Sequence, residues 1–351
     1  MCRCCTVKCT GIISNRPYPK SVSGKRFHSV STFSISTSGG GRRKFLSDLT
    51  IRYCTYDAID KVKWDACIDR APNGLLYAYS VYLDAMAKHW DALVLGDYEA
   101  VMPLTWNRKY GICYLYQPPF TACLGVFGKT VDAGTLQAFL EAIPAKFRYW
   151  DISLNPGNVF PVNGFRLHER MNYVLSLNDT YEQLYGRFRE NIRRNIKKAE
   201  QYALIARRNI PVEKVLDLAR QQIRGFADVP DDAFRHFEDL YQVLYKQERA
   251  TTYGVYGKDD TLLASAVFLF SHNRAYYILV GNHPNGKTLG ASHILINAFI
   301  KDHAGQDVLL DFEGSDIPGL AFFYNSFGAQ EEKYSALKMN RLPLWLKWLK
   351  N

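Results

Sequence analysis

The stretch that decides the fold reads DFEGSDIPGLAFFYNSFGA and spans residues 311–329. An apolar run leads into it, the acids Asp311 and Glu313 follow, and an aromatic segment then runs to Gly328. This pattern predicts a buried strand over residues 307–314, a glycine turn, and a short helix over residues 318–326 that ends near the final glycine.

The two acids are the first candidates for chemistry. If the strand continues through them, Asp311 and Glu313 point to the same face, because side chains two apart in a strand share a face. A buried or paired carboxylate there would have a raised pKa and could act as a general base, and Glu313 has the longer reach. Two acids at the end of a strand also commonly cap the next turn, so this alternative stays open.

Tyr324 stands four residues before Gly328, one turn from the predicted end of the helix. A tyrosine hydroxyl in this place could donate a proton to a leaving group. The alternative is a core aromatic among the neighbouring phenylalanines Phe322, Phe323 and Phe327.

The preceding elements form an ordered second half of the chain. A charged helix over 181–202 opens it, and two further helices follow over 212–227 and 231–249. Three strands, TTYGVYG, LLASAVFLFS and RAYYILVGN, are then separated by short turns, which is typical of an antiparallel meander. A helix over 292–303 leads into the opening stretch, and a strand containing EKYSALKM follows it.

The first half, from Ile51, has a similar order. We expect a strand at 51–56, helices over 57–69 and 79–89, three strands between 91 and 120, a helix over 135–145, the strand RYWDISL, and a final pair of strands that closes near Leu177.

The two halves end in matching order. YWDISLNP precedes Phe160, Gly164 and NYVLSL, as LLDFEGS precedes Tyr324, Gly328 and KYSALKM. The recurring order of strand, acid, aromatic, glycine and strand indicates an internal duplication, with domains at 51–177 and 178–351. Only the second copy has a hydroxyl before the glycine, so we expect catalysis there.

Three motifs carry a family resemblance. YNSFGA, PGLAFFYNSFG and RENIRRNIKKAEQYAL are similar to segments of the GNAT acyltransferase fold, and residues 51–351 resemble the duplicated GNAT arrangement of the Fem-type peptidyltransferases and their bacterial relatives. The resemblance implies an α/β (α+β) fold of two tandem GNAT-like domains, each a twisted, mostly antiparallel mixed sheet flanked by helices. It also implies an N-acyltransferase that moves an acyl or aminoacyl group from acyl-CoA or aminoacyl-tRNA to an amine.

The family's phosphate-binding turn corresponds to HPNGKTLGAS, residues 283–292. Gly286 fits the first glycine, whereas His283 and Thr288 depart from the pattern and Gly290 comes two residues late. The resemblance implies a site for acyl-CoA as co-substrate, formed by Val280, Gly281, Gly286, Lys287 and Gly290. We expect the oxyanion contact to come from a backbone N–H on the preceding strand, around residues 279–281. A plain glycine turn before a helix is the alternative.

The helix from Arg187 carries six cations, of which Arg189, Arg193 and Lys197 share one face. An anionic ligand would suit this face: a nucleotide-sugar phosphate, a phosphorylated lipid carrier or a tRNA backbone. A solvated helix is the ordinary explanation. A second hypothesis follows, a catalytically silent duplicated scaffold that binds an anionic ligand or RNA. The aromatic run YLYQPPF, 114–120, would line a substrate groove or form a strand edge.

The first fifty residues differ from the rest. They hold nine Lys/Arg and one acid, whereas the remaining 301 residues carry 35 basic and 33 acidic groups, which gives no case for DNA binding by the body. Their Ser-rich, basic composition predicts a disordered tail, with a transit peptide or a mis-assigned start as alternatives.

Four cysteines crowd the first nine residues, which is too close for a tetrahedral metal site, so we expect no metal. Single cysteines in the body and the absence of a membrane-length apolar run favour a cytoplasmic protein. The resemblance implies a small-molecule or cell-envelope amine as the acceptor, with tRNA as a possible donor.

Overall fold

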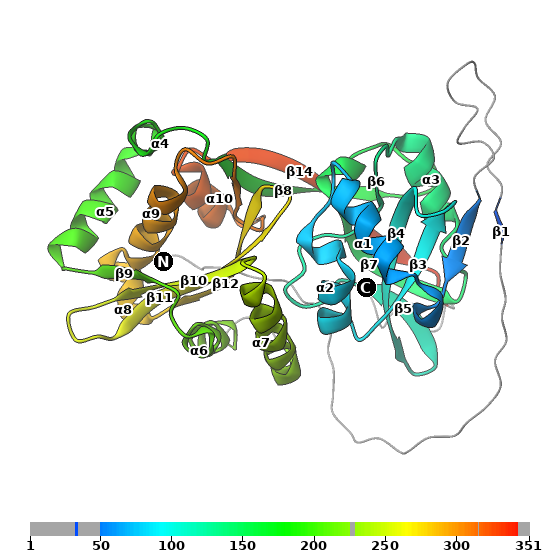
Figure 1. Ribbon diagram of the computed structural model, residues 1–351, viewed down its shortest axis with the longest axis horizontal. Helices are drawn as coiled ribbons and strands as arrows, with labels where there is room; N and C mark the ends of the chain where they lie inside the picture. Colours follow the sequence, from blue (N-terminus) through cyan, green and yellow to red (C-terminus); the bar gives the residue numbers. More distant parts are fainter. Residues whose placement is uncertain (1–31, 34–49, 225–228, 315, 343–351) are drawn as a thin grey trace.

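The computed structural model describes residues 32–33, 50–224, 229–314 and 316–342 (Figure 1). The predicted tail lies outside these residues, apart from Thr50 and the two-residue strand β1 (Thr32–Phe33), which pairs antiparallel with β2. No helix in the described part of the chain is long and apolar enough to cross a membrane.

The first half builds a sheet with helices on both sides. The capping residue of its first helix is Asp60, whose carboxylate accepts hydrogen bonds from the N–H groups of Val62 and Lys63. Its strands are β2 (Ile51–Cys54), β3 (His89–Leu95), β4 (Ala100–Lys109), β5 (Ile112–Tyr116), β6 (Phe127–Gly128), β7 (Phe147–Leu154) and β8 (Leu167–Ser176). Its helices are α1 (Lys61–Arg70), α2 (Ser80–Met86) and α3 (Ala133–Glu141).

The second half repeats this plan with more helices. Its strands are β9 (Ile205–Arg208), β10 (Ala250–Tyr256), β11 (Leu262–Ser271), β12 (Arg274–Asn282), β13 (Leu309–Asp311) and β14 (Gln330–Asn340). Its helices are α4 (Tyr181–Arg187), α5 (Glu190–Gln201), α6 (Val212–Ile223), α7 (Asp231–Lys246), α8 (Pro284–Leu289), α9 (Ala291–His303) and α10 (Pro318–Asn325).

One continuous sheet joins the halves, in the order β1-β2-β3-β4-β5-β7-β14-β8-β13-β12-β11-β10-β9. Each half contributes an antiparallel run that ends in a parallel pair, β5 with β7 and β12 with β13. The last strand of each half then inserts into the other half: β8 pairs with β13, β14 pairs with β7, and β8 and β14 pair with each other. The duplicated plan is therefore present, and the two copies exchange their final strands.

Three apolar cores fill the molecule. One lies on the outer face of the first half around α3, and a second lies in the second half around α5, α9 and α10. The third is shared, because α1 and α2 of the first half pack with α6 and α7 of the second. Figure 1 shows α7 beside α2 at this junction, and the two helices are in contact. The halves thus share both a sheet and a core.

The predicted helix over 181–202 is wrong in one respect, because the chain leaves the helix at Phe188 and Arg189. Phe188 is buried against Phe327, and the Arg189 N–H donates to the carbonyl of Ser326 at 2.8 Å. These contacts with the segment after α10 stabilise extended backbone at both residues, so Arg189 becomes the N-cap of α5. The expected pair of strands before Leu177 is also wrong, since this segment forms the single strand β8.

Candidate functional site

The strands β12 and β13 part at the centre of the second half. They pair in parallel only from Arg274 to Tyr276, opposite Leu309 to Asp311, and β12 then continues to Asn282 paired with β11 alone. Beyond this point β12 is irregular: its register against β11 shifts, and Leu279 takes a left-handed φ of 50°. A bulge re-aims the backbone groups of a strand, here at Leu279 and Val280, where an oxyanion contact was predicted.

Tyr324 lies on one face of this parting. Its side chain is 4% exposed and its ring stacks on Phe312, with centroids 4.5 Å apart. Tyr173 and Phe323 complete the surrounding aromatic group. The structure thus places the Tyr324 ring in the core around α10, as the core-aromatic alternative also predicted.

Asp311 lies on the opposite face and is fully engaged. Its carboxylate accepts from Arg274 Nη1 at 2.6 Å, from Asn172 Nδ2 at 2.9 Å and from the N–H of Glu313 at 2.8 Å. Arg274 also donates to both carboxylate oxygens of Glu332. Burial opposes the charge on Arg274, but Asp311 and Glu332 outweigh it and raise the pKa of the guanidinium, while its hydrogen bonds hold the pKa of Glu332 below the ordinary value.

Glu313 reaches the same cluster by a different route from the predicted one. The strand β13 ends at Asp311, and Glu313 takes a left-handed φ of 63°. Its carboxyl faces Tyr77 of the first half, and burial, reinforced by Asp311, raises its pKa well above the ordinary range. Burial likewise raises the pKa of Tyr77, so this phenol stays neutral. The turn at Glu313, and not a shared strand face, therefore brings the two acids together.

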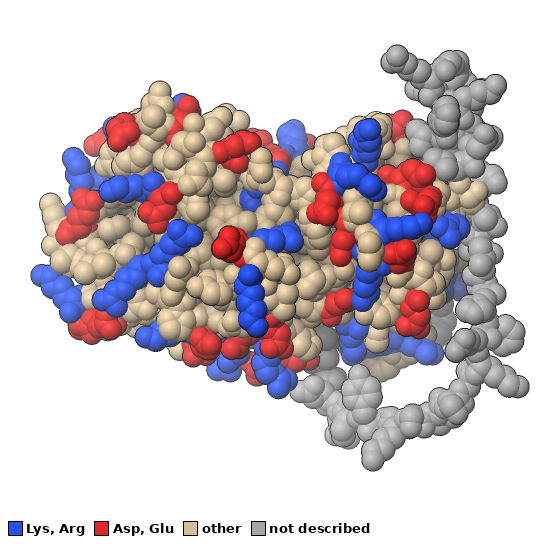
Figure 2. Space-filling model, in the orientation of Figure 1, with Lys and Arg blue, Asp and Glu red and all other residues tan. Residues whose placement is uncertain are grey.

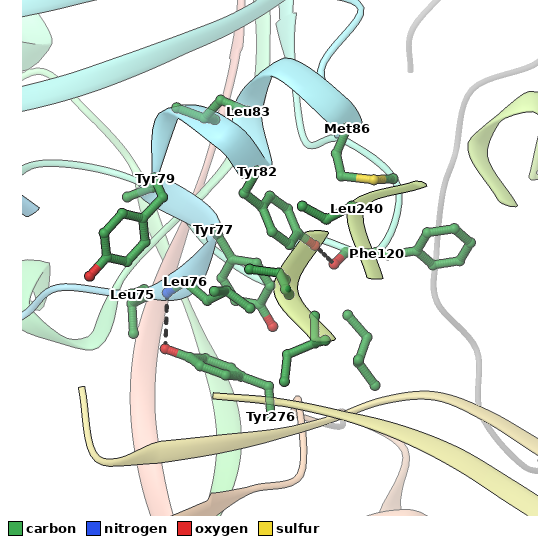
Figure 3. Packing of buried hydrophobic residues seen from close by; sticks show 14 of the residues in the cluster. Leu75, Leu76, Tyr77, Tyr79, Tyr82, Leu83, Met86, Phe120, Leu240 and Tyr276 are labelled. Atoms are coloured by element: carbon green, nitrogen blue, oxygen red, sulfur yellow. Dashed lines mark hydrogen bonds between the residues drawn. The ribbon is translucent and has the colours of Figure 1, made fainter. Parts of the chain in front are cut away.

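Tyr77 is held in place by the shared core, as Figure 3 shows. Its ring lies edge-on to Tyr276 and to Tyr82, at 5.2 Å between centroids in both cases. The Tyr276 hydroxyl accepts from the Leu76 N–H at 3.1 Å, and Tyr82 donates to the Phe120 carbonyl. Phe120 itself packs on α7, so the end of the YLYQPPF run contributes to the core and forms no groove wall there.

The predicted phosphate turn forms the helix α8 and the start of α9. Gly286 is buried against the carbonyl of Leu263, and Gly281 lies against α6, so both serve close packing. Lys287 is exposed. Gly290, with φ of 80°, joins the two helices, and α9 begins there with no side-chain cap. The five predicted cofactor residues thus lie along one continuous segment from β12 to α9.

The cationic face of α5 points outward. Arg189 places its guanidinium 5.2 Å from the ring of Phe322 on α10, and Arg193 and Lys197 are exposed. Among the described residues, no carboxylate lies within ion-pair distance of these three cations, in contrast to Arg187, which pairs with Asp179 at 2.6 Å. Figure 2 shows acidic and basic side chains interspersed over both halves, with basic ones at the left edge, where Figure 1 places α5.

Several residues of the site gave no local sequence signal. Tyr77, Asn172, Arg274 and Glu332 join the acid pair from segments far apart in the chain. His293 of α9 is a further case: it lies edge-on to Phe323, and burial lowers its pKa to about 4. Asp311, just before the turn, was the one local sign of this cluster, because a buried carboxylate needs hydrogen-bond or charged partners.

The comparisons with known proteins agree with this geometry. Residues 186–317 match the family model described as an acetyltransferase (GNAT) domain. The segment includes β12, its bulge, the α8–α9 turn and the acid pair, so the second half is similar to that domain over these elements.

Solved structures extend the likeness over both halves. The crystal structure of FemX matches with a TM-score of 0.58 and 14% identity, covering 79% of this chain and 96% of FemX. A conserved protein of unknown function from Bacteroides thetaiotaomicron VPI-5482 matches with a TM-score of 0.51 and 13% identity, covering 80% and 97%. No curated protein matches the sequence. The chain therefore has the GNAT-like fold in the duplicated, Fem-type arrangement.

Proposed function

We propose that this protein is an N-acyltransferase that moves an acyl or aminoacyl group from acyl-CoA or aminoacyl-tRNA to an amine. One observation carries the proposal: β12 and β13 part beside a bulge, with Tyr324 on one face of the parting and Glu313 on the other. A proton donor and a proton acceptor on opposite faces suit a reaction whose two substrates approach from opposite sides.

The proton accounting assigns one role to each group. The acceptor arrives as an ammonium ion, and the Glu313 carboxylate takes one of its protons so that the nitrogen can attack the acyl carbon. The N–H groups at the Leu279–Gly281 bulge would stabilise the developing oxyanion. The bond to the leaving sulfur or oxygen then breaks, and the Tyr324 hydroxyl gives its proton to this atom. The nitrogen loses its second proton to the resulting phenolate, so that Tyr324 is a phenol again and Glu313 keeps one proton for release to solvent. Asp311 positions Glu313 by accepting its N–H.

The donor would lie against the segment from Val280 to Gly290. The first turn of α9 attracts phosphate through its N–H groups and helix dipole, and Lys287 adds a cation. The cationic residues Arg189, Arg193 and Lys197 extend this charge across α5, which would favour a long polyanionic donor such as tRNA.

The test offers the purified chain labelled acetyl-CoA or charged tRNA together with a panel of amines. Transfer should occur from one donor, and Tyr324→Phe should lower kcat by about 10²–10⁴-fold, the usual contribution of a general acid. Tyr185→Phe, a half-buried tyrosine in the same half that packs on Phe188, is the matched control and should keep full activity. Transfer that survives Tyr324→Phe unchanged would remove this residue from the mechanism.

The exposed cations of α5 favour one alternative function, a silent scaffold that binds an anionic ligand or RNA. In that case neither donor would be consumed, and RNA binding would weaken steeply with salt. The variant Arg193→Gln/Lys197→Gln should then weaken binding without any change in melting temperature, because both side chains are exposed.

A further inference from the structure

The tyrosine hydroxyls of the shared core have partners of two kinds, and Figure 3 shows three of these tyrosines together. Tyr82 donates to a backbone carbonyl, and Tyr276 accepts from a backbone N–H at 3.1 Å. Both bonds join a side chain to the backbone and so stabilise the fold. Tyr77 differs, because its side-chain hydrogen bond is with the carboxyl of Glu313.

This contact crosses from one half of the molecule to the other. Tyr77 lies in the 3₁₀ helix Leu76–Ala78 of the first half, and Glu313 follows β13 in the second. Both side chains line one small cavity at the junction, and Tyr77 is 1% exposed. The Tyr77 hydroxyl has no partner besides the Glu313 carboxyl among the described residues. The first half thus directs a buried hydrogen-bond donor at the candidate base of the second.

The hydroxyl of Tyr77 contributes little to the stability of the core. A phenylalanine would fill the same space, and one hydrogen bond gains little net free energy because its groups bind water in the unfolded chain. Burial raises the pKa of Tyr77 well above its ordinary value, and Glu313 adds to the effect, so the phenol stays neutral and keeps its donor. Its effect on Glu313 therefore explains the hydroxyl better than the packing does.

The neighbours of Glu313 act on its ionisation in opposite directions. Burial raises its pKa and Asp311 adds to this, whereas the Tyr77 hydrogen bond and the Arg274 guanidinium lower it. Tyr77 favours the carboxylate form without bringing a charge that would form an ion pair with it. The other titratable groups around Glu313 are Cys123, Tyr82, Tyr276 and Tyr334, whose pKa values burial raises, and Glu332, which pairs with Arg274.

We propose that Tyr77 is a positioning residue for the transfer, which orients the Glu313 carboxylate by donating a hydrogen bond to it. This inference rests on the proposed function, in which Glu313 is the base, and it adds a residue of the first half to the site. Tyr77 keeps its own proton throughout, so the proton balance of the reaction is unchanged. The first half then completes the site as well as supporting the fold.

Infrared spectroscopy of the full-length protein tests the hydrogen bond without any substrate. Glu313 should hold its proton at about pH 6, above the ordinary range of a glutamate, so its C=O band is the difference between the natural chain and Glu313→Gln. In Tyr77→Phe, measured against Tyr77→Phe/Glu313→Gln, the band should move to higher frequency because the carboxyl loses its donor. Tyr82→Phe, which loses a bond to a backbone carbonyl, is the matched control and should leave the band in place.

The pH dependence of kcat tests the role in transfer. Loss of a hydrogen bond to a charged acceptor should move the rising limb of kcat in Tyr77→Phe to higher pH by about one to two units, because the pKa of Glu313 rises. At neutral pH, kcat should therefore fall about 10–100-fold and recover as the pH rises, while KM for the donor stays the same. Tyr82→Phe should keep the limb in place while its melting temperature falls.

The outcomes separate this inference from the proposed function. A moved band together with a moved limb would support the role of Tyr77. A moved band in a protein that transfers nothing from either donor would contradict the enzyme and support the contact between Tyr77 and Glu313. Transfer with an unmoved limb in Tyr77→Phe would support the enzyme and overturn the positioning role. An absent or unmoved band, or a melting temperature that falls as far in Tyr77→Phe as in Tyr82→Phe, would also overturn it, because the hydroxyl would then serve the fold alone.

Discussion

Glu313 combines two unfavourable features in one residue. Its φ of 63° lies in the left-handed region, which costs a non-glycine residue roughly 1–2 kcal/mol, and its carboxyl is buried beside another carboxylate. Neighbours hold it there: Asp311 accepts its N–H, and Tyr77 covers its side chain. Strain and a perturbed pKa at the same residue are typical of functional sites, because no gain in stability explains them.

The raised pKa of Glu313 predicts how stability varies with pH. The folded state holds this proton more tightly than the unfolded chain, so the contribution of Glu313 is fully present below its ordinary pKa and is lost as the pH rises through the raised value. Glu313→Gln cannot ionise, so its stability relative to the natural chain should increase as the pH rises from about 4.5 into the alkaline range. Urea midpoints across this range measure the difference.

The charged neighbours Arg274, Asp311 and Glu332 are present in both proteins, so the comparison changes one side chain only. Glu182→Gln, on the exposed face of α4, is the control and should track the natural chain at every pH. A constant difference between Glu313→Gln and the natural chain would mean that Glu313 ionises as freely when folded as when unfolded.

At the scale of elements, the apolar pattern of the sequence predicted those helices and strands whose bounds depend on nearby residues. The meander β10 to β12 and the helices α6 and α7 follow apolar periodicity, and the structure has them close to the predicted bounds. The break at Phe188 and Arg189 was missed because a distant contact with the segment after α10 causes it. The end of β13 was missed likewise, since the turn at Glu313 depends on Asp311 and its partners.

Gly290 gives the junction of α8 and α9 its shape. Its φ of 80° is left-handed, and a Cβ there would lie 2.8 Å from the Asn195 carbonyl oxygen of α5. Gly305 has a φ of 79° with nothing within 4 Å of such a Cβ, which makes it a matched control. Gly305→Ala should lower the free energy of unfolding by about 1–2 kcal/mol through backbone strain alone. Gly290→Ala should lose about 1–3 kcal/mol more, because α5 must move.

Urea unfolding of both variants measures this difference. If α5 carries part of the donor site, Gly290→Ala should also raise KM for the donor while Gly305→Ala leaves it unchanged. Equal destabilisation by the two substitutions would show that α5 does not pack on Gly290 in solution.

At the scale of the whole molecule, the candidate site exists only because the halves exchange strands. Asn172 comes from β8 and Glu332 from β14, 160 residues apart, and Arg274 of β12 ties Glu332 to Asp311. The sequence shows the repeat but not the exchange of strands. The strand pattern of each copy is the same whether β8 and β14 pair within their own half or with the other half. The partners of the acid pair were unpredictable for the same reason.

The exchange predicts that the halves unfold together. In a Trp345→Phe/Trp348→Phe background, the remaining tryptophans, Trp64, Trp90, Trp106 and Trp150, all lie in the first half. Phe299→Ala empties a site that is 0% exposed in the core of the second half and should cost about 3–5 kcal/mol. Because β8 and β14 join the sheets, the urea midpoint seen by tryptophan fluorescence should fall as far as the one seen by far-ultraviolet circular dichroism.

Phe139→Ala, in the core around α3, is the mirror control and should shift both signals equally. A fluorescence midpoint that stays in place in Phe299→Ala would mean that the first half is stable without the second. The junction between the halves would then be able to open while each half stays folded.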